Sequence, residues 1–199
     1  MPSKPCVLSG APLAGALLFL AAFLANPVAA QPAAPASAAR CVACHGANGN
    51  SVIPSIPSLA GQPKVFLENH LVLIREGMRD IPAMTGQLDG LSDKELGALA
   101  TYFSAQTPAA PSTTPQPDIF ERGKVIAKNM LCASCHESNY AGREQMPRLA
   151  AQHEAYLRDV MKQFRDHPAP GRDTVMSASL HGLKDADLAD LAHYLAHLK

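Results

Sequence analysis

The sequence has no excess charge of either sign and no sign of a β-strand. Its 199 residues contain 17 Lys and Arg against 17 Asp and Glu, whereas a protein that binds nucleic acid carries a basic surplus. Val, Ile and Thr never alternate with polar residues over the length of a strand, which argues against a sheet. The composition therefore argues against nucleic acid as a partner and predicts an all-α fold.

Long apolar runs and spare cysteines are also missing. The apolar run from Leu13 to Ala25 is too short to read as a membrane span. It follows Lys4 and leads into small residues just before position 31, which is the pattern of a cleaved secretory signal peptide over residues 1–30. Because Cys6 would be lost with that peptide, the four remaining cysteines all lie in two short motifs, and no structural disulfide is expected.

Those motifs are Cys41-Val42-Ala43-Cys44-His45 and Cys132-Ala133-Ser134-Cys135-His136. Each has the spacing of a c-type haem attachment site. The two cysteines of a motif can form thioethers with the two vinyl groups of one haem, while the histidine that follows reaches the iron. A disulfide, half of a zinc site or a thioredoxin-like redox pair would use the same Cys-x-x-Cys spacing. The adjacent histidine and the repetition favour two covalently bound haem c groups, each with its iron.

The two halves of the chain repeat each other beyond these motifs. The segment 57–62, Pro-Ser-Leu-Ala-Gly-Gln, returns 90 residues later at 147–152 as Pro-Arg-Leu-Ala-Ala-Gln. Between the halves, the uncharged segment 108–117 contains four prolines and is typical of an extended connector. We therefore predict two tandem haem domains, 31–107 and 118–199, joined by a Pro-rich linker at 108–117.

Each half is expected to be a small helical wrap around its haem. Apolar residues at helical spacing predict helices over 64–76 and 153–165. The last helix of the first half opens with Ser92 and Glu95, a capping-box pattern, and its counterpart opens with Asp185 as the expected cap.

Once a histidine has bound, one axial position remains on each iron, and a thioether sulfur there suits electron transfer. Met84 lies 39 residues after His45, Met176 lies 40 residues after His136, and both follow an Arg-Asp pair. This symmetry predicts Met84 and Met176 as the sixth ligands. Met78 is a weaker rival as a ligand, because the position 92 residues later is Pro170. Met130, Met146 and Met161 have no comparable partner in the first half and are interpreted as packing residues. The histidines outside the motifs also lack counterparts, and surface or capping roles are expected for them: His70, His153, His167, His181, His193 and His197.

A ligating imidazole normally donates its other ring N–H to an acceptor that fixes the tautomer of the ring. The carbonyls of Pro57 and Pro147, which open the repeated segments, are the candidate acceptors. Proline also brings no N–H of its own that would need a partner beneath the haem. A simple loop turn is the alternative reading of both prolines.

The order of these features, Cys-x-x-Cys-His, Pro-x-Leu-Ala-x-Gln, a helix, Arg-Asp, Met and a final helix, occurs twice over residues 40–199. In duplicate it resembles the dihaem cytochrome c4 family. The resemblance implies two domains of the mitochondrial-type cytochrome c fold, related by pseudo-two-fold symmetry, whose haems approach through their propionate edges. In that family His45 and Met84 would ligate the first iron, and His136 and Met176 the second.

The resemblance also implies a periplasmic electron carrier with loose membrane association. Its redox partners would be a quinol-cytochrome c reductase or a dehydrogenase as donor and a terminal oxidase as acceptor, and we expect a monomer without enzymatic activity of its own. The alternative is the cytochrome subunit of a redox enzyme, such as a flavocytochrome sulfide dehydrogenase, which would show a large apolar docking patch. A dihaem peroxidase or gas sensor would need an open iron, which Met ligation closes.

The two halves depart from each other ahead of their haem motifs. The second half has Phe120, Gly123 and Ala127 there, which the family's first helix requires for packing against the last helix. The first half offers only residues 31–40, with two prolines and no aromatic. We therefore predict a short first helix, and a first haem that is more exposed and less stably held than the second.

Overall fold

The computed structural model describes residues 1–3, 31–167 and 171–199. The predicted signal peptide lies outside the described residues, apart from its first three. Residues Gln31–Lys199 form one compact unit. Its described part contains helices and an isolated bridge between Arg143 and Met146 but no strand, which confirms the all-α prediction. Within that part, no helix combines the length and the apolar character needed to cross a membrane.

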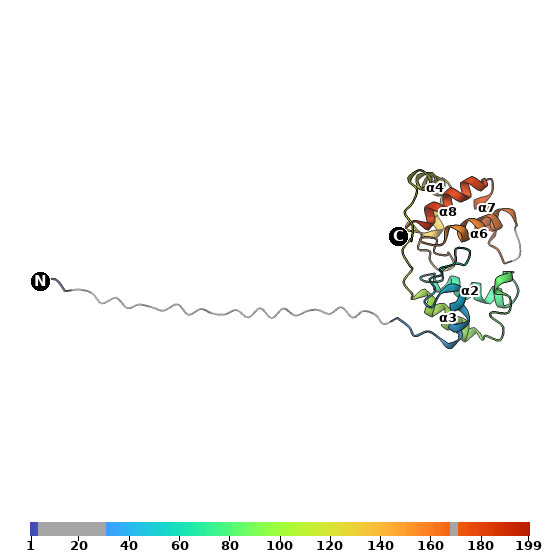
Figure 1. Ribbon diagram of the computed structural model, residues 1–199, viewed down its shortest axis with the longest axis horizontal. Coiled ribbons are helices and arrows are strands. Elements are labelled where there is room, and N and C mark those ends of the chain that lie inside the picture. The colour runs from blue at the N-terminus through green and yellow to red at the C-terminus, as the bar shows by residue number, and fades with distance from the viewer. Residues whose placement is uncertain (4–30, 168–170) are drawn as a thin grey trace. The chain divides into compact units, whose positions relative to one another are not determined.

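The first half is built around one pair of helices. Its elements are η1 (Ala36–Ala38), α1 (Ala39–His45), α2 (Lys64–Arg75), η2 (Pro82–Met84) and α3 (Asp93–Ser104). Helices α2 and α3 pack together (Figure 1) and bury Leu67 against Leu96, Leu99 and Phe103. Helix α3 begins with the predicted capping box, in which the Ser92 hydroxyl accepts from the Glu95 N–H and the Glu95 carboxylate accepts from the Ser92 N–H.

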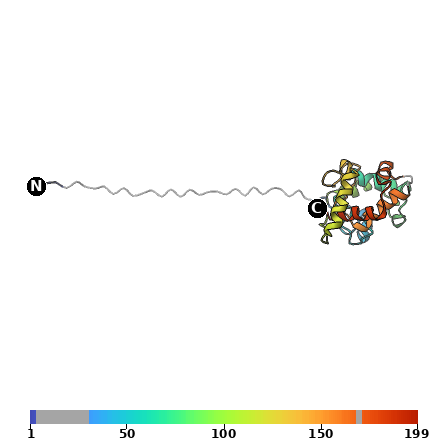
Figure 2. The same cartoon turned by 90° about the horizontal axis from the view of Figure 1, so that it is seen from above.

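The second half has a larger helical frame. Its elements are α4 (Pro117–Asn129), α5 (Ala133–His136), α6 (Glu154–Asp166), α7 (Thr174–Leu180) and α8 (Asp185–Ala196). Helix α8 packs against both α4 and α6 (Figures 1 and 2). The crossing with α4 is closest at Gly123, where a Cβ atom would overlap the Asp190 carbonyl oxygen and the Tyr194 side chain. Only glycine lets the two backbones approach this closely.

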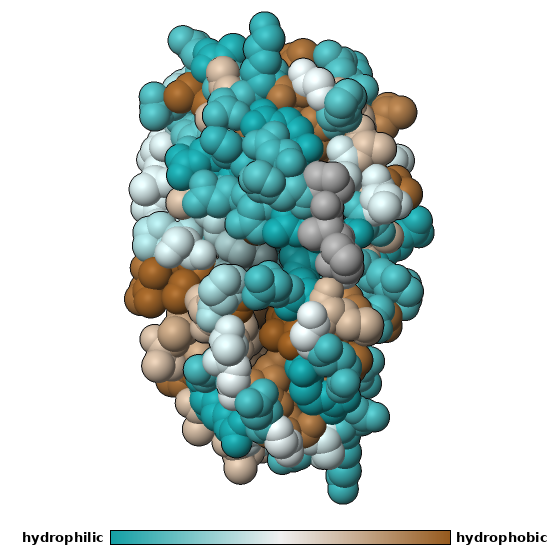
Figure 3. Space-filling view, turned by 90° about the vertical axis from the view of Figure 1, so that its right-hand side faces the viewer, coloured by the Kyte–Doolittle hydropathy of each residue, from teal (hydrophilic) through white to brown (hydrophobic). Residues whose placement is uncertain are grey.

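Nothing like α4 precedes the first haem motif. Among the described residues before Cys41, the only regular structure is η1 and the first two residues of α1. This confirms the predicted short first helix. The two halves also differ on the face shown in Figure 3, where hydrophobic residues gather mainly in the lower part of the view and hydrophilic residues cover most of the upper part, over the second half.

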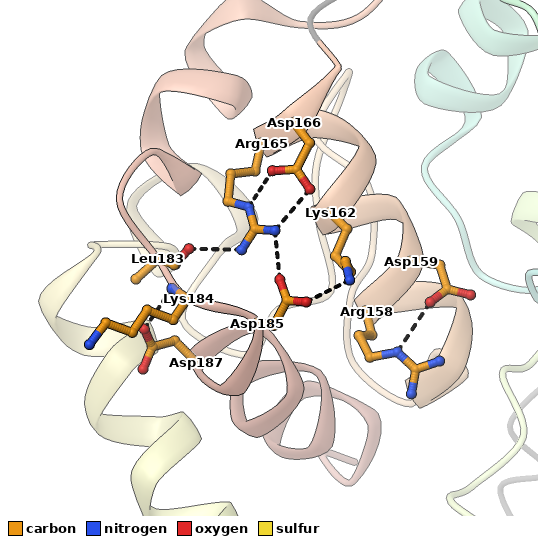
Figure 4. A network of polar contacts seen from close by, with 9 residues as sticks. All are labelled: Arg158, Asp159, Lys162, Arg165, Asp166, Leu183, Lys184, Asp185 and Asp187. Carbon is orange, nitrogen blue, oxygen red and sulfur yellow. Dashed lines mark hydrogen bonds and ion pairs between the residues drawn. The ribbon is translucent and has the colours of Figure 1, made fainter.

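An arginine at the end of the middle helix braces each half in the same way. Arg75, the last residue of α2, donates to the Leu91 carbonyl at 2.9 Å and to Asp93 at 2.7 Å. In the second half, Arg165 donates to the Leu183 carbonyl at 2.8 Å and to Asp185 at 2.6 Å (Figure 4). Each arginine thus ties the end of α2 or α6 to the start of α3 or α8, on either side of the segment that contains a candidate methionine ligand.

The prediction that Asp185 caps the last helix was wrong. Asp185 is the first residue of α8 rather than its cap, and its carboxylate is occupied by Arg165 and Lys162 (Figure 4). At the start of the helix, the backbone N–H of Lys184 donates instead to the Asp187 carboxylate at 2.8 Å. The sequence pattern alone could not show this, because the competing cations come from α6.

His193 also departs from the expected surface or capping role. It is buried in α8, its Nδ1 bonds the Glu154 carboxylate at 2.9 Å, and its Nε2 accepts from the Gln116 N–H at 3.0 Å. His197 continues this contact by bonding Thr113 at 2.8 Å. The two histidines therefore fasten the C-terminal part of the Pro-rich linker to α8.

Candidate haem sites

Both motif histidines close a short helix and lie buried beneath it. His45 ends α1 and is 8% exposed, and His136 ends α5 and is 6% exposed. His45 Nδ1 bonds the Pro57 carbonyl oxygen at 2.8 Å, and His136 Nδ1 bonds the Pro147 carbonyl oxygen at 2.9 Å. A carbonyl can only accept, so Nδ1 carries the ring proton in both cases and Nε2 keeps its lone pair. Nε2 is then the atom that can bind a metal.

Burial favours the neutral form of both rings. It lowers the pKa of His45 and of His136, and the bond to a proline carbonyl opposes that effect in part. Since only a neutral imidazole can donate a lone pair to iron, the apolar surroundings favour the protonation state that ligation needs.

The four described cysteines are arranged alike in the two halves. Cys41 and Cys132 are half-buried, Cys44 and Cys135 are exposed, and none is in a disulfide. Burial raises the pKa of the Cys41 and Cys132 thiols. Among the described residues, the cluster that could hold a metal ion is Glu154, His193 and His197, which contains no cysteine. The described part of the chain also contains no sheet. Nothing in it therefore supports interpreting the motifs as a zinc site or as a thioredoxin-like redox pair.

The candidate methionines belong to different cores. Met84 ends η2 and packs against the hydrophobic cluster of the first half, while Met176 lies in the first turn of α7 and packs against that of the second. The Met176 N–H is bonded by the Asp173 carboxylate at 2.9 Å, whereas the Met84 N–H is bonded by the Ile81 carbonyl at 2.7 Å. Met161 is a buried core residue and Met78 is half exposed, in line with the packing role expected for Met161.

Two arginines test whether these residues fit haem. Arg79 and Arg172, the arginines of the two Arg-Asp pairs, lie 5.9 and 6.0 Å from the centroid of the Phe164 ring. Burial lowers the pKa of Arg79, and the neighbouring Arg172 adds to this effect. Arg172 Nη1 is buried and has no hydrogen-bond partner among the described residues. Two half-buried guanidinium groups beside the same ring, with no ion pair to a carboxylate in the described part of the chain, call for an anion, and haem carries two propionates. The residues present therefore fit the group that the motifs indicate.

The structure brings together two residues whose role the sequence did not reveal. Gln62 and Gln152, the last residues of the repeated segments, are each 5% exposed and reach across to the opposite half. Gln62 accepts from the Arg148 N–H and donates to the Arg148 carbonyl, both at 2.9 Å. Gln152 accepts from the Ser58 N–H at 2.8 Å and donates to the Ser58 carbonyl at 2.9 Å. Their only signal in the sequence was recurrence at an offset of 90 residues.

The two halves match separate family models. Residues 120–199 match the model described as "Cytochrome c", and residues 29–103 match "Cytochrome C oxidase, cbb3-type, subunit III". The chain therefore contains two cytochrome c-type domains, with one haem attachment motif in each.

Relatives cover nearly the whole chain. The cytochrome c4 of Pseudomonas aeruginosa is 34% identical, over 88% of this chain and 92% of its own length. The thiosulfate dehydrogenase electron acceptor of Thiomonas intermedia is 32% identical, over 88% and 86%. The crystal structure of reduced cytochrome c4 from Pseudomonas stutzeri has a TM-score of 0.76 and 32% identity, over 81% of this chain and 95% of the other.

Repeated attachment motifs, a doubled helical fold and full-length relatives agree on the cofactor and the class of protein. The chain binds two haem c groups covalently, one in each of its two cytochrome c-type domains. It belongs to the cytochrome c4 family of dihaem electron carriers.

Proposed function

We propose that the protein is a periplasmic one-electron carrier with two closed haem sites, ligated by His45 and Met84 in domain 31–107 and by His136 and Met176 in domain 118–199. The observation that carries this proposal is a hydrogen bond found in both halves. In each, the Nδ1 of the motif histidine donates to a proline carbonyl, which leaves its Nε2 free for iron. Haem c, when bound, supplies the one-electron iron couple.

The chain's own residues prepare each site for that couple. The proline carbonyl holds the imidazole ring in one orientation, so little reorganisation accompanies a change of charge at the iron. Met84 and Met176 would supply a soft thioether sulfur, and Arg75 and Arg165 link the helices that flank the segments carrying them. Arg79 and Arg172 would neutralise propionate charge near the contact between the halves.

Single methionine variants test the ligation. Met84→Ala and Met176→Ala should each remove about half of the near-infrared absorption band typical of Met-to-ferric-iron charge transfer, because each site has one thioether sulfur. Each variant should also gain carbon monoxide binding at one reduced haem. Met78→Ala is the matched control, since Met78 is half exposed and should leave the spectrum unchanged.

A full band in Met84→Ala or Met176→Ala would refute that ligand assignment. Carbon monoxide binding by the unmodified protein would show an open iron, and the peroxidase or sensor function would then replace electron transfer as the better explanation.

Two observations bear on the partners. The first domain matches the model described as "Cytochrome C oxidase, cbb3-type, subunit III", which supports a terminal oxidase as the acceptor. The donor would be a quinol-cytochrome c reductase or a dehydrogenase. The similarity to a thiosulfate dehydrogenase electron acceptor favours a second function as the acceptor subunit or partner of a redox enzyme. Rates of reduction by a thiosulfate dehydrogenase with thiosulfate, and of oxidation by oxidase-containing membranes, separate the two, because an oxidase-linked carrier is oxidised rapidly by the membranes.

A further inference from the structure

The axial histidine of each half is linked by hydrogen bonds to a glutamine of the other half. His45 Nδ1 donates to the carbonyl oxygen of the Pro57-Ser58 peptide, and the N–H of that same peptide donates to Gln152 Oε1. In the second half, His136 Nδ1 donates to the carbonyl oxygen of the Pro147-Arg148 peptide, and its N–H donates to Gln62 Oε1. One peptide group therefore separates each imidazole from a side chain of the opposite domain.

We propose that Gln62 and Gln152 are positioning residues that tune the haem of the opposite domain through these peptide groups, so that the contact between the domains sets the reduction potential of each iron. This inference rests on the proposed ligation of the irons by His45 and His136.

The chemistry follows from the polarity of a peptide group. When Gln62 Oε1 accepts from the Arg148 N–H, it draws the peptide dipole toward greater negative charge on the Pro147 oxygen. That oxygen becomes a better acceptor for the His136 N–H, and the ring becomes a stronger donor to iron at Nε2. A stronger donor favours the ferric state, so the glutamine lowers the potential of the haem in the other domain.

The site is shielded from water, which would otherwise take the place of these bonds. Gln62 and Gln152 are each 5% exposed. The cavity between them, lined also by Ser58 and Arg148, has a volume of about 10 Å³, which is room for about one water molecule at most. In so dry a contact, linked hydrogen bonds polarise one another by roughly 10–30% per bond.

The two links are not equal. Gln152 Oε1 is shared, because it also accepts from the His153 N–H at 3.0 Å. The position that corresponds to His153 in the first half is Pro63, which has no N–H. Gln62 therefore offers its oxygen to Arg148 without that competitor, and the link from the first domain to the second haem is the stronger one.

The test is a set of single variants of the haem-loaded protein with separate measurement of the two haems. Gln62→Leu should raise the potential of the second haem and shift the ring proton signals of His136 in the NMR spectrum of the oxidised protein. The first haem should change little. Gln152→Leu should act on the first haem and His45, with a smaller shift. Amide exchange at Arg148 in Gln62→Leu, and at Ser58 in Gln152→Leu, should accelerate about tenfold, the factor expected for loss of one buried hydrogen bond.

Gln106→Leu is the matched control. Gln106 is also buried in the first half, but its side chain donates to the Tyr102 carbonyl at 3.0 Å and to neither peptide. It should leave the potentials of both haems unchanged. Gln62→Glu at mildly acid pH provides a second variant, because a buried, protonated carboxyl both accepts and donates as an amide does. It should return the second haem to wild-type behaviour.

The proposal predicts that each glutamine variant shifts the reduction potential of the haem in the opposite domain. A shift confined to the haem of the mutated domain, equal shifts of both haems, or no shift would overturn the relay. A general loosening of the domain contact would wet both haems and lower both potentials, which is the opposite sign. Absence of iron-shifted ring signals from His45 and His136 in the unmodified protein would instead overturn the ligation on which the relay rests.

Discussion

The two haem domains differ in the structure that precedes and supports the haem motif. In the second domain a 13-residue helix, α4, precedes the haem motif and crosses α8 at Gly123, whereas the first domain has only η1 and the seven-residue α1 in that place. Isolated helices this short are marginal in water. Ahead of the first motif, η1 makes only a small contact with α3, and Arg40 bonds the Asp89 carbonyl at 3.0 Å. Ahead of the second motif, α4 packs along α8.

Backbone conformation shows the reverse difference. Three positions of the first domain with left-handed φ are glycines, and the corresponding positions of the second carry side chains: Gly46 and Glu137, Gly49 and Tyr140, Gly61 and Ala151. A side chain in this region costs about 1 kcal/mol or more. Tyr140 is buried, with its ring centroid 5.8 Å from that of Tyr194, so packing offsets its cost, whereas Ala151 has little side chain to pack. The second domain is thus better covered but more strained locally.

The largest expected effect comes from closing the contact between α4 and α8. Gly123→Val would place a side chain against the Asp190 carbonyl and Tyr194, and should lower the free energy of unfolding of the second domain by about 3 kcal/mol, the upper part of the range for overpacking. Thermal unfolding, with amide exchange resolved by domain, measures the change.

The control for this variant is a helical glycine of the first domain. At Gly97 in α3 a Cβ would come no closer than 3.5 Å, to Glu68 Oε1, so Gly97→Ala should stabilise the first domain by about 0.5–1 kcal/mol through helix propensity. Similar losses in both variants would show that glycine content, and not the close crossing, explains the result.

Much of this architecture could be predicted because the same sequence pattern occurs in both halves of the chain. The helices α2 and α6 were expected within one residue of their observed ends, and the bonds of the motif histidines to Pro57 and Pro147 were expected from the chemistry of a ligating imidazole. Repetition separates residues with a shared role from residues that merely pack, which a single copy does not allow.

Contacts between elements distant in the sequence escaped prediction. Arg75 and Arg165 occupy matching positions, but only the fold shows that each reaches the start of the final helix. Gln62 and Gln152 stand where a helix is about to begin, and their partners lie 86 and 94 residues away. His193 looked like a surface residue because its partners come from α6 and from the linker.

The next largest effect is the difference in local stability between the two haem motifs. Amide exchange in residues 39–45 should be at least about tenfold faster than in residues 124–132, because opening α1 breaks few buried contacts while opening α4 exposes its packing against α8. Tenfold corresponds to about 1.4 kcal/mol of opening free energy. Exchange measured on the haem-loaded protein tests this, and equal or greater protection around Cys41 than around Cys132 would contradict a less stably held first haem.

The smallest effect is expected at Ala151, where a change to glycine tests the backbone difference, and the reverse change at the equivalent Gly61 is its counterpart. Ala151→Gly should stabilise the second domain by less than about 1 kcal/mol, because relief of the left-handed conformation is partly cancelled by the greater freedom of glycine in the unfolded chain. Gly61→Ala should destabilise the first domain by about 1–3 kcal/mol, since the new Cβ would be strained at this φ and would overlap the Pro108 ring. Chemical denaturation of both variants measures the pair. If Gly61→Ala were neutral, the glycines of the first domain would be interchangeable with side chains, and the strain inferred in the second domain would have no energetic meaning.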